Sequence, residues 1–523
     1  MKIAAIDIGS NSIKLVVVEA AASDSFAVLV REKEAVRLGH DTLRKRVLAP
    51  DAILRAADCI KRFRSIAEAR GATRLAAIAT ASVREAYNAA NFIAEIKTLT
   101  GVRVEVLSGI EEARLIGLAA SKGCASSREA TLINIDIGGG STEISVVRDG
   151  APLALFSVKL GAVGLTEKFI NSDPVKPKEL RLLQDEIRAA LERPSRELGG
   201  HTWLHATGTS GSIIAIGEAL RLRTLRDAEN KQQAAQPTGA EIVLSQLERF
   251  NNRMAEMNVA EQRGVAGISA QRAEIIVAGG QILEGVMRAL GINYLRTCDW
   301  ALREGVILDR LSEMDAESRP PVPDTDDVRL RGVHAVGRRF GYEETHAHLV
   351  ASFAEKIFDA MISAYDFTRH QRTLLSAAAL LHDVGYTIAH EAHHKHSLYL
   401  IKHSELTGFS EAERNVIANI ARYHRGALPR ERHLDYLALN EHDRATVNQL
   451  SAILRVADAL DRSHDARVQE ITPIFDKQTL HIELLSAQPC DKEIWAAERK
   501  CDLFEQVFNC KVTTSQRANA KRA

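Results

Sequence analysis

The sequence has no excess of charge of either sign. Its 523 residues include 68 lysine and arginine residues and 68 aspartate and glutamate residues, so the formal net charge is zero. A polyanionic ligand therefore cannot be attracted by the field of the whole molecule and needs a local cluster of donors. With 46% hydrophobic and 26% charged residues, the composition is that of an ordinary globular protein and excludes a disordered or collagen-like chain.

The sequence also lacks membrane and secretion signals. No segment approaches the roughly 20 consecutive apolar residues of a membrane-spanning helix, and the chain runs directly into apolar residues 3–6 without an h-region or cleavage site. The cysteines form no CxxC pair and no zinc-finger spacing, so we expect reduced thiols. From the absence of membrane and secretion signals we expect a cytoplasmic protein, and we expect neither membrane nor nucleic-acid partners. The six cysteines are Cys59, Cys124, Cys298, Cys490, Cys501 and Cys510.

Histidine placement divides the chain into two chemically different parts. Three of the 18 histidines precede residue 300, and the other fifteen lie between His334 and His481. The proline-rich stretch 317–324 between these parts is typical of a linker. Because 523 residues exceed what one hydrophobic core can organise, we expect two to four domains.

The first part contains an internal repeat. Residues 4–12 and 132–142 each consist of an apolar run, an aspartate, a glycine turn and small hydroxyl residues, and a second apolar run follows each copy. The two aspartates, Asp7 and Asp136, lie 129 residues apart, which suits one α/β lobe. Each copy therefore predicts a strand, a tight turn and an antiparallel strand.

Alternation of strands and helices before residue 300 predicts the covered sheets of an α/β fold. After residue 330 the pattern predicts helices alone, and the polar, basic tail 513–523 is expected to fray. The further predicted strands are 74–79, 102–107, 203–206 and 275–278, and the predicted helices are 51–70, 91–99, 178–191, 347–365, 369–382, 411–423 and 446–460.

The two glycine turns of the repeat predict a clamp for phosphate, because glycine lets backbone N–H groups approach phosphate oxygens. The turns are 9–12 and 138–142, and neither is a Walker A loop, since no G-x-x-x-x-G-K-[ST] motif occurs. Asp136 ends a strand, where its carboxylate can hold Mg²⁺ against phosphate. Glu143 is either a second metal ligand or an outward-facing strand residue.

A helix start at residues 108–114 supplies the candidate general base. Ser108 and Glu111 have the spacing of a capping box, which gives Glu111 a structural role. Glu112 has no such role, and its position in the first helical turn favours a nearby anion. We therefore predict that Glu112 accepts a proton from the attacking water, with Glu111 as the second choice. The alternative is that both glutamates are surface acids.

Three further segments follow predicted strands. In residues 80–84, the hydroxyl of Ser82 and the guanidinium of Arg84 suit phosphate contact. The glycine turns 206–212, which include Thr209, and 278–280 either line the same cleft or only let strands meet helices closely.

Four of these segments together resemble the exopolyphosphatase/guanosine pentaphosphate phosphohydrolase family in residues, order and spacing: 7–12, 80–84, 108–114 and 136–143. The resemblance implies an α/β fold of two ribonuclease-H-like lobes of the actin/sugar-kinase/Hsp70 type. The lobes would span residues 1–124 and 125–305, with the substrate cleft between them.

The resemblance also implies the roles of individual residues. Asp136 and Glu143 would serve Mg²⁺, with Mn²⁺ as an alternative, and Glu112 would activate water. The residues implied for phosphate binding are Gly9, Ser10, Asn11, Ser12, Arg84, Gly138, Gly139, Gly140 and Ser141.

The histidine-rich part resembles HD-superfamily phosphohydrolases. His382 and Asp383 lie in a predicted apolar helix, within the order H…HD…H…H…D. The resemblance implies an all-α HD-like domain over residues 306–523. The other members of this order are His346, His396, His424 and Asp458.

Two interpretations of the HD-like domain stay open. In the first, it is a helical scaffold that forms a homodimer interface and a wall of the substrate channel. In the second, His346, His382, Asp383 and Asp458 bind a divalent metal and cut a second phosphoester. The histidines at 390–394 belong either to such a site or to the solvated surface.

We predict from these patterns a magnesium-dependent exopolyphosphatase that releases orthophosphate from the end of inorganic polyphosphate. The alternative substrate is guanosine pentaphosphate. A kinase on the same fold and a non-catalytic sensor of polyphosphate or of guanosine alarmones are the remaining hypotheses, and the acidic Glu112, Asp136 and Glu143 argue against the sensor.

Overall fold

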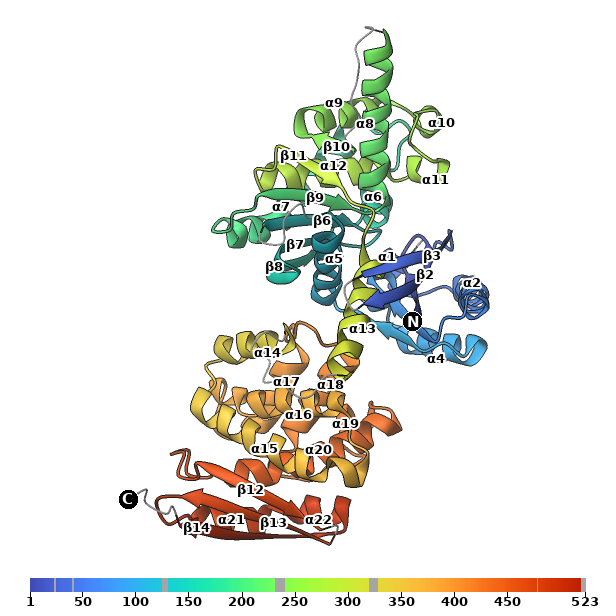
Figure 1. Ribbon diagram of the computed structural model, residues 1–523. Helices are drawn as coiled ribbons and strands as arrows, with labels where there is room; N and C mark the ends of the chain where they lie inside the picture. Colours follow the sequence, from blue (N-terminus) through green and yellow to red (C-terminus); the bar gives the residue numbers. More distant parts are fainter. Residues whose placement is uncertain are drawn as a thin grey trace. The chain divides into compact units, whose positions relative to one another are not determined.

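The computed structural model describes residues 1–22, 25–39, 42–124, 130–230, 240–318, 328–476 and 478–518. The chain divides into two compact units, Met1–Val322 and Pro323–Ala523, whose elements are labelled in Figure 1. The division falls within the predicted linker 317–324, most of which lies outside the described residues.

The first sheet has the strand order β3-β2-β1-β4-β5, with β1 antiparallel to β2 and parallel to β4. Its continuous apolar runs are buried on both faces, as strands between two helical layers require. One face packs on α2 and α4, and the other packs on α5 and α13. These elements are β1 Lys2–Ile8, β2 Ile13–Ala22, β3 Ser25–Glu34, β4 Arg74–Ala79, β5 Val104–Val106, α2 Pro50–Ala69, α4 Ala89–Thr100, α5 Gly109–Cys124 and α13 Leu302–Ser318.

The second sheet repeats this arrangement in the order β10-β11-β9-β6-β7-β8. Strand β6 is antiparallel to β7 and parallel to β9, as β1 is to β2 and β4, so the sequence repeat is also a repeat of topology. These strands are β6 Thr131–Ile137, β7 Thr142–Arg148, β8 Ala151–Val158, β9 His205–Thr209, β10 Glu241–Val243 and β11 Tyr294–Thr297.

Helix α5 connects the two lobes. It packs on α13 beside the first sheet, and it also packs on β7 and β8 of the second sheet. The hydroxyl of Ser145 on β7 donates to the carbonyl oxygen of Ala113 at 2.6 Å. The first turn of α5 is therefore held between the lobes. Helix α13 contains residues 306–318, which the sequence analysis assigned to the third domain, and it packs within the first unit.

The predicted strand 275–278 is wrong, because these residues begin α12 (Ile276–Ala289), and Gly279 and Gly280 lie inside that helix. A Cβ atom at Gly280 would lie 2.1 Å from the Asn251 side chain of α9, so this glycine permits close helix packing and forms no turn. The remaining helices of the first unit are α1 Thr42–Lys45, α3 Ala81–Arg84, α6 Ala162–Phe169, α7 Pro177–Leu198, α8 Gly211–Asn230, α9 Leu244–Glu256, α10 Val259–Arg263 and α11 Ala270–Ala273.

The second unit confirms the predicted helical region and adds a sheet that the sequence analysis missed. Its helices pack around one hydrophobic core. The three-stranded sheet β12-β13-β14 follows them, so the expectations of helices alone and of a fraying tail are wrong for residues 470–518. The elements are α14 Val328–Arg339, α15 Glu344–Tyr365, α16 Arg369–Leu381, η1 Val384–Thr387, α17 His393–Lys402, α18 Glu411–Arg422, α19 Leu434–Leu437, α20 Glu441–Ala459, β12 Glu470–Phe475, β13 Thr479–Ser486, α21 Asp491–Lys500, α22 Asp502–Phe508 and β14 Lys511–Ala518.

The cysteines contradict one expectation. Cys124, at the end of α5, and Cys298, just after β11, form a disulfide, so not all thiols are reduced. The partners are 174 residues apart in the sequence, and only the fold brings their Cα atoms to 6.3 Å. The other four cysteines are free and buried.

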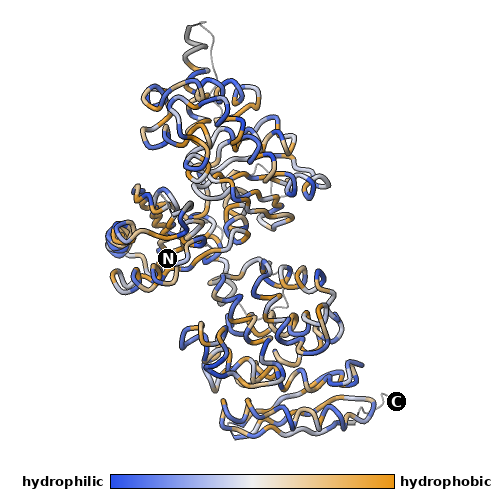
Figure 2. The backbone as a smooth tube through the Cα atoms, turned by 180° about the vertical axis from the view of Figure 1, so that it is seen from behind, coloured by the Kyte–Doolittle hydropathy of each residue, from blue (hydrophilic) through white to orange (hydrophobic). Residues whose placement is uncertain are grey.

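Hydrophobic residues follow the strands and the inner faces of the helices, and hydrophilic residues gather on loops (Figure 2). Over the described residues, no helix combines the length and the apolar character that crossing a membrane requires.

Candidate active site

The two hairpins of the repeat end in equivalent four-residue turns. The Gly9 N–H donates to the carbonyl oxygen of Ser12 at 3.2 Å, and the Gly138 N–H donates to that of Ser141 at 2.8 Å. Both turns therefore take up the same closed shape. Glycine begins each turn and fills the first three positions of the second, where backbone N–H groups without a Cβ atom can approach phosphate oxygens.

The two hairpins share the same register, but the residue opposite the repeated aspartate differs between them. Asp7 on β1 pairs across the ladder with Lys14, and their charged groups lie 3.5 Å apart. Asp136 on β6 pairs with Glu143. One copy therefore contributes an ion pair, and the other contributes two carboxylates.

The two glycine turns lie against each other, as the predicted clamp requires. A Cβ atom at Gly139 would lie 2.8 Å from the Cβ of Ser10, which is closer than such atoms approach. A cavity of about 90 Å³ is lined by both turns together with Asp7, Asp136 and Glu112. The residues predicted to bind phosphate that line it are Gly9, Ser10, Asn11, Ser12, Gly138, Gly139, Gly140 and Ser141.

The neighbouring glutamates of α5 have different partners. The Glu111 N–H donates to Ser108 Oγ at 3.1 Å, as in the predicted cap, while the Glu111 carboxylate pairs with Arg114 at 2.6 Å. Glu112 faces the cavity and accepts a hydrogen bond from Arg84 Nη1 at 2.9 Å. The structure therefore gives Glu111 a structural partner and leaves Glu112 as the glutamate that can reach a ligand.

Glu112 lies within electrostatic reach of two more buried carboxyl groups, those of Asp136 and Glu143. Burial raises the pKa of all three. Burial raises the pKa of Glu112 to about 7, although Arg84 acts in the opposite direction. The pKa of Glu143 is well above its ordinary value because of burial and the neighbouring Glu112. Burial also raises the pKa of Asp136, whose carboxylate accepts a hydrogen bond from the Thr209 hydroxyl.

The carboxyl groups of Asp136 and Glu143 are suited to bind a divalent cation. Glu143 Oε1 accepts a hydrogen bond from Ser157 at 2.8 Å, whereas the buried Oε2 has no hydrogen-bond partner among the described residues. Carboxylate oxygens are the ligands that Mg²⁺ takes in phosphate-processing sites, usually one or two per ion. A cation held by Asp136 and Glu143 would satisfy this oxygen and offset the repulsion between the acids.

Three cations that the sequence analysis did not select line the same cavity, and a fourth lies beside one of them. Lys14, Arg272 and Arg303 line the cavity, and Lys33 lies opposite Lys14 on β3. Desolvation, with repulsion from Arg272, Lys14 and Arg303, lowers the pKa of Lys33 to about 8. These residues come from β2, β3, α11 and the first turn of α13, so no local motif marks them.

The other predicted phosphate contacts have different surroundings. Arg84 also donates to the carbonyl oxygen of Leu107 at 3.0 Å, which fixes its guanidinium beside Glu112. The Thr209 hydroxyl is bound to Asp136, and the Ser82 side chain is fully buried. Their neighbours Thr80 and Ser210 line the cavity.

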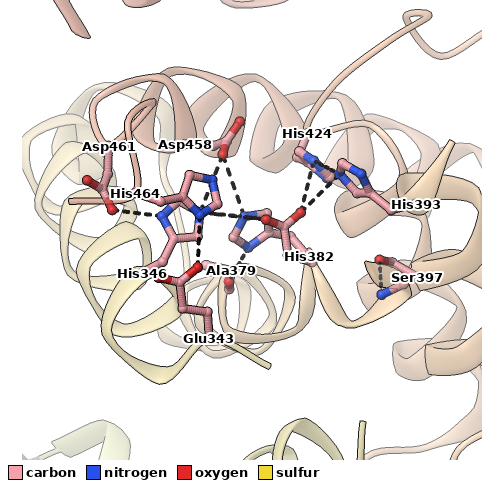
Figure 3. Close-up of polar contacts among 12 residues, drawn as sticks. Glu343, His346, Ala379, His382, His393, Ser397, His424, Asp458, Asp461 and His464 are labelled. Atoms are coloured by element: carbon pink, nitrogen blue, oxygen red, sulfur yellow. Dashed lines mark hydrogen bonds and ion pairs between the residues drawn. The ribbon is translucent and has the colours of Figure 1, made fainter. Parts of the chain in front are cut away.

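A second polar cluster lies in the C-terminal unit, where the structure brings together His346, His382, Asp383 and Asp458 (Figure 3). His346 Nε2 and His382 Nε2 are 3.3 Å apart. The Asp458 Oδ1 atom is 3.7 Å from the first of these nitrogens and 3.6 Å from the second. These side chains come from α15, the end of α16 and α20, which are far apart in the sequence.

Two more histidines complete this cluster. His393 Nε2 and His424 Nε2 are 3.3 Å apart and lie 3.1 and 3.5 Å from Asp383 Oδ1. The sequence analysis named His424 but placed His396 before it, and left His393 ambiguous. The residue that the structure brings to the cluster is His393, at the start of α17.

Two repeated sheets with a cavity between glycine turns, lined by a buried acid, define a phosphate-transferring enzyme of the actin/sugar-kinase/Hsp70 type. The model of the Ppx/GppA phosphatase family matches residues 16–314, and the model of domain III of these phosphatases matches residues 328–498. The chain therefore belongs to the Ppx/GppA phosphatase family, and it is a phosphoanhydride hydrolase.

Three solved structures are similar to the chain. An exopolyphosphatase from Cytophaga hutchinsonii is 24% identical, with 60% of this chain and 98% of that one covered and a TM-score of 0.54. An exopolyphosphatase-like protein is also 24% identical, with 60% and 100% covered and a TM-score of 0.53. The PPX-GPPA enzyme of Aquifex aeolicus is 25% identical, with 59% and 99% covered and a TM-score of 0.49. The first two show that the fold is shared.

Proposed function

We propose that the protein is a magnesium-dependent exopolyphosphatase, which removes the terminal phosphate of inorganic polyphosphate as orthophosphate. The observation that carries the proposal is the position of Glu112. It is a buried glutamate with a pKa of about 7, facing a cavity between two glycine turns. A general base works best when its pKa lies near the working pH.

The mechanism depends mainly on position and charge. The backbone N–H groups of the two turns would bind the terminal phosphoryl group, and Arg272 would offset its negative charge. The Glu112 carboxylate would accept the proton of the attacking water, while Arg84 holds that carboxylate in place. Asp136 and Glu143 would hold Mg²⁺, which neutralises charge on phosphate oxygens in such reactions. Orientation of the water and the phosphoryl group supplies much of the acceleration in phosphoryl transfer.

The cavity favours a chain of phosphates over a guanosine nucleotide. Among the described residues that line it there is no aromatic side chain on which a base could stack. The four cations Lys14, Lys33, Arg272 and Arg303 instead suit the repeated charges of polyphosphate. The kinase hypothesis requires a pocket for adenosine, and the described residues that line this cavity supply no aromatic side chain for such a base.

The test compares orthophosphate release from polyphosphate and from guanosine pentaphosphate, side by side with Mg²⁺, in wild type and Glu112→Gln. We expect faster release from polyphosphate in wild type and a fall of about 10²-fold or more in kcat for Glu112→Gln, with substrate binding retained. Glu95→Gln, at an exposed position of α4, is the matched control. Unchanged turnover in Glu112→Gln would remove the general base, and faster release from the pentaphosphate would reassign the substrate.

A further inference from the structure

The chain crosses between the two lobes twice. The first crossing is α5, which stands between β5 of the first sheet and β6 of the second in the sequence. The second crossing is the segment 298–301, which follows β11 of the second sheet and leads into α13 on the first sheet. Hinge motions are absorbed by a few residues at the ends of elements, so a change in the angle between the lobes must pass through these two segments.

The second crossing passes from one lobe to the other within a short stretch. The N–H of Cys298 donates to the carbonyl oxygen of Gly208 on β9 at 2.9 Å, and its side chain packs with residues of β6 and β7. The Trp300 ring then stacks on that of Phe26 on β3, with the ring centroids 5.0 Å apart. Cys298 is therefore fixed to the second lobe, and Trp300 is fixed to the first.

The disulfide joins the two crossings. Cys124 is the last residue of α5, and its bond partner is Cys298. The helix and the second crossing are in close contact here, because a Cβ atom at Gly123 would lie 2.6 Å from the Trp300 side chain. A disulfide keeps its Cα atoms within about 6.8 Å of each other, and these two are 6.3 Å apart. The crossings therefore cannot separate while the bond is intact.

Both joined elements reach the cavity. Glu112 lies in the first turn of α5, and Arg303, at the start of α13, lines the same cavity of about 90 Å³. The two glycine turns touch at Gly139 and Ser10, so the lobes are closed in the disulfide-bonded protein. For a phosphate chain to enter and for orthophosphate to leave, the lobes must part. Opening of this kind limits turnover in many enzymes.

We propose that the bond between Cys124 and Cys298 is a redox switch of the cleft. The oxidised form restrains the lobes in the closed arrangement, and reduction by a dithiol frees both crossings and speeds turnover. The inference rests on the proposed function only in taking the cleft between the glycine turns as the substrate site.

The surroundings of the two sulfur atoms set the order of the reduction. Cys124 is partly exposed and Cys298 is buried, so a thiolate of the dithiol reaches the sulfur of Cys124. A mixed disulfide forms there, and Cys298 leaves as a thiolate that takes a proton from solvent. The second thiolate of the reductant then displaces Cys124, which is also protonated, and the dithiol becomes a cyclic disulfide. The Trp300 carbonyl oxygen, 3.5 Å from Cys298 Sγ, can accept the hydrogen of the new thiol.

The switch is tested first on the full wild-type chain without substrate. Oxidised glutathione or dithiothreitol sets the redox state, and alkylation of the denatured protein with mass spectrometry counts the thiols. We expect four alkylated cysteines after oxidation and six after reduction. Six in both states would overturn the proposal.

Hydrogen exchange of the glycine turns then measures how often the lobes part. In segments 9–12 and 138–142 it should be at least about fivefold faster in the reduced protein, the lower end of typical couplings between distant sites. Helix α2, which packs on the first sheet, is the internal reference. Equal exchange of the turns in both states, or an equal acceleration in α2, would overturn the switch.

Turnover is tested as orthophosphate release from polyphosphate with Mg²⁺ in both redox states. We expect kcat to rise by about fivefold or more on reduction and to fall again on reoxidation. Cys124→Ser/Cys298→Ser should have the kcat of the reduced protein with or without dithiol. Cys59→Ser, at a buried free thiol of α2, is the matched control and should keep the full response.

The two measurements separate the switch from the substrate assignment. Equal kcat in the oxidised and reduced wild-type protein would overturn the switch. If neither form releases phosphate from polyphosphate while the exchange rates still differ, the proposed function is contradicted and the switch is supported, because the exchange measurement uses no substrate.

Discussion

At the scale of single residues, the cleft contains ionisable groups whose pKa values are shifted from their ordinary values. The buried acids Glu112, Asp136 and Glu143 have raised pKa values, whereas that of Lys33 is lowered to about 8 by desolvation and by nearby cations. The raised pKa of the acids and the lowered pKa of Lys33 both show that burial disfavours the charged forms when no ligand compensates for them. A bound metal ion favours the ionised acids, and a bound polyanion favours the protonated lysine. Ligand binding should therefore change the number of protons bound to these groups.

Lys33 makes this linkage measurable. Its amine is protonated below about pH 8 and neutral above it, so the attraction for polyphosphate falls as the pH rises through that value. If bound phosphate raises the pKa by one unit, affinity should fall by up to about tenfold at high pH. Isothermal titration calorimetry of Glu112→Gln with polyphosphate between pH 7 and pH 9.5 measures this. Lys33→Arg stays charged and should bind with little pH dependence over the range, and an equal slope in both proteins would contradict the assignment.

At the scale of elements, the repeated hairpins set the width of the clamp. Gly139 lies so close to Ser10 that an added Cβ atom, 2.8 Å from the Ser10 Cβ and 3.3 Å from the Val163 side chain, would separate the two turns. A shift of about 1 Å in a phosphoryl-transfer site can cost about 10²-fold in rate.

We therefore expect Gly139→Ala to lower kcat for polyphosphate by 10- to 100-fold, on this general scale, while the protein still folds. Gly200→Ala is the control, because a Cβ atom there meets no other atom within 4 Å. Steady-state kinetics at saturating Mg²⁺, together with thermal denaturation, separates the two effects. Wild-type kcat in Gly139→Ala would show that the turns need not touch.

The disulfide is the second feature at this scale. Cys124 and Cys298 join the end of α5 to the segment after β11 and close a loop of 174 residues. Cross-links of this kind typically stabilise a protein by about 2 to 4 kcal/mol, mainly by restricting the unfolded chain. Cys124→Ser/Cys298→Ser should lower the free energy of unfolding by this amount, measured by denaturant titration. Wild type in reducing agent should match the variant, and a midpoint unaffected by reductant would show that the bond contributes nothing.

At the scale of the whole molecule, sequence analysis predicted those strands, turns and helices whose residues carry a local pattern. The Asp–Gly hairpins, β4 and the helices α2, α15 and α18 were predicted within a few residues, because each has its own apolar pattern, turn or cap. The alternating strand β13, buried at every second residue, had such a pattern and was overlooked. The short apolar run at 275–278 was predicted as a strand and begins the helix α12. Four apolar residues are too few to distinguish a strand from a buried helix.

Features that depend on distant contacts could not be predicted in this way. Arg272 and Arg303 reach the cleft only because α11 and the start of α13 return to it, and no motif surrounds either residue. Cys124 and Cys298 are paired by topology alone. The choice of His393 over His396 depends on how α17 begins, which local spacing leaves open.

The unequal copies of the repeat have one more consequence. Where the first hairpin places a lysine opposite its aspartate, the second places a glutamate, so the first contributes a neutral ion pair and the second contributes two acidic side chains. In the proposed function, a linear polyanion would place its cation-neutralised end against these two acids and its body near Lys14 and Lys33. Such an asymmetry would make the enzyme shorten its substrate from the tip and leave internal bonds untouched.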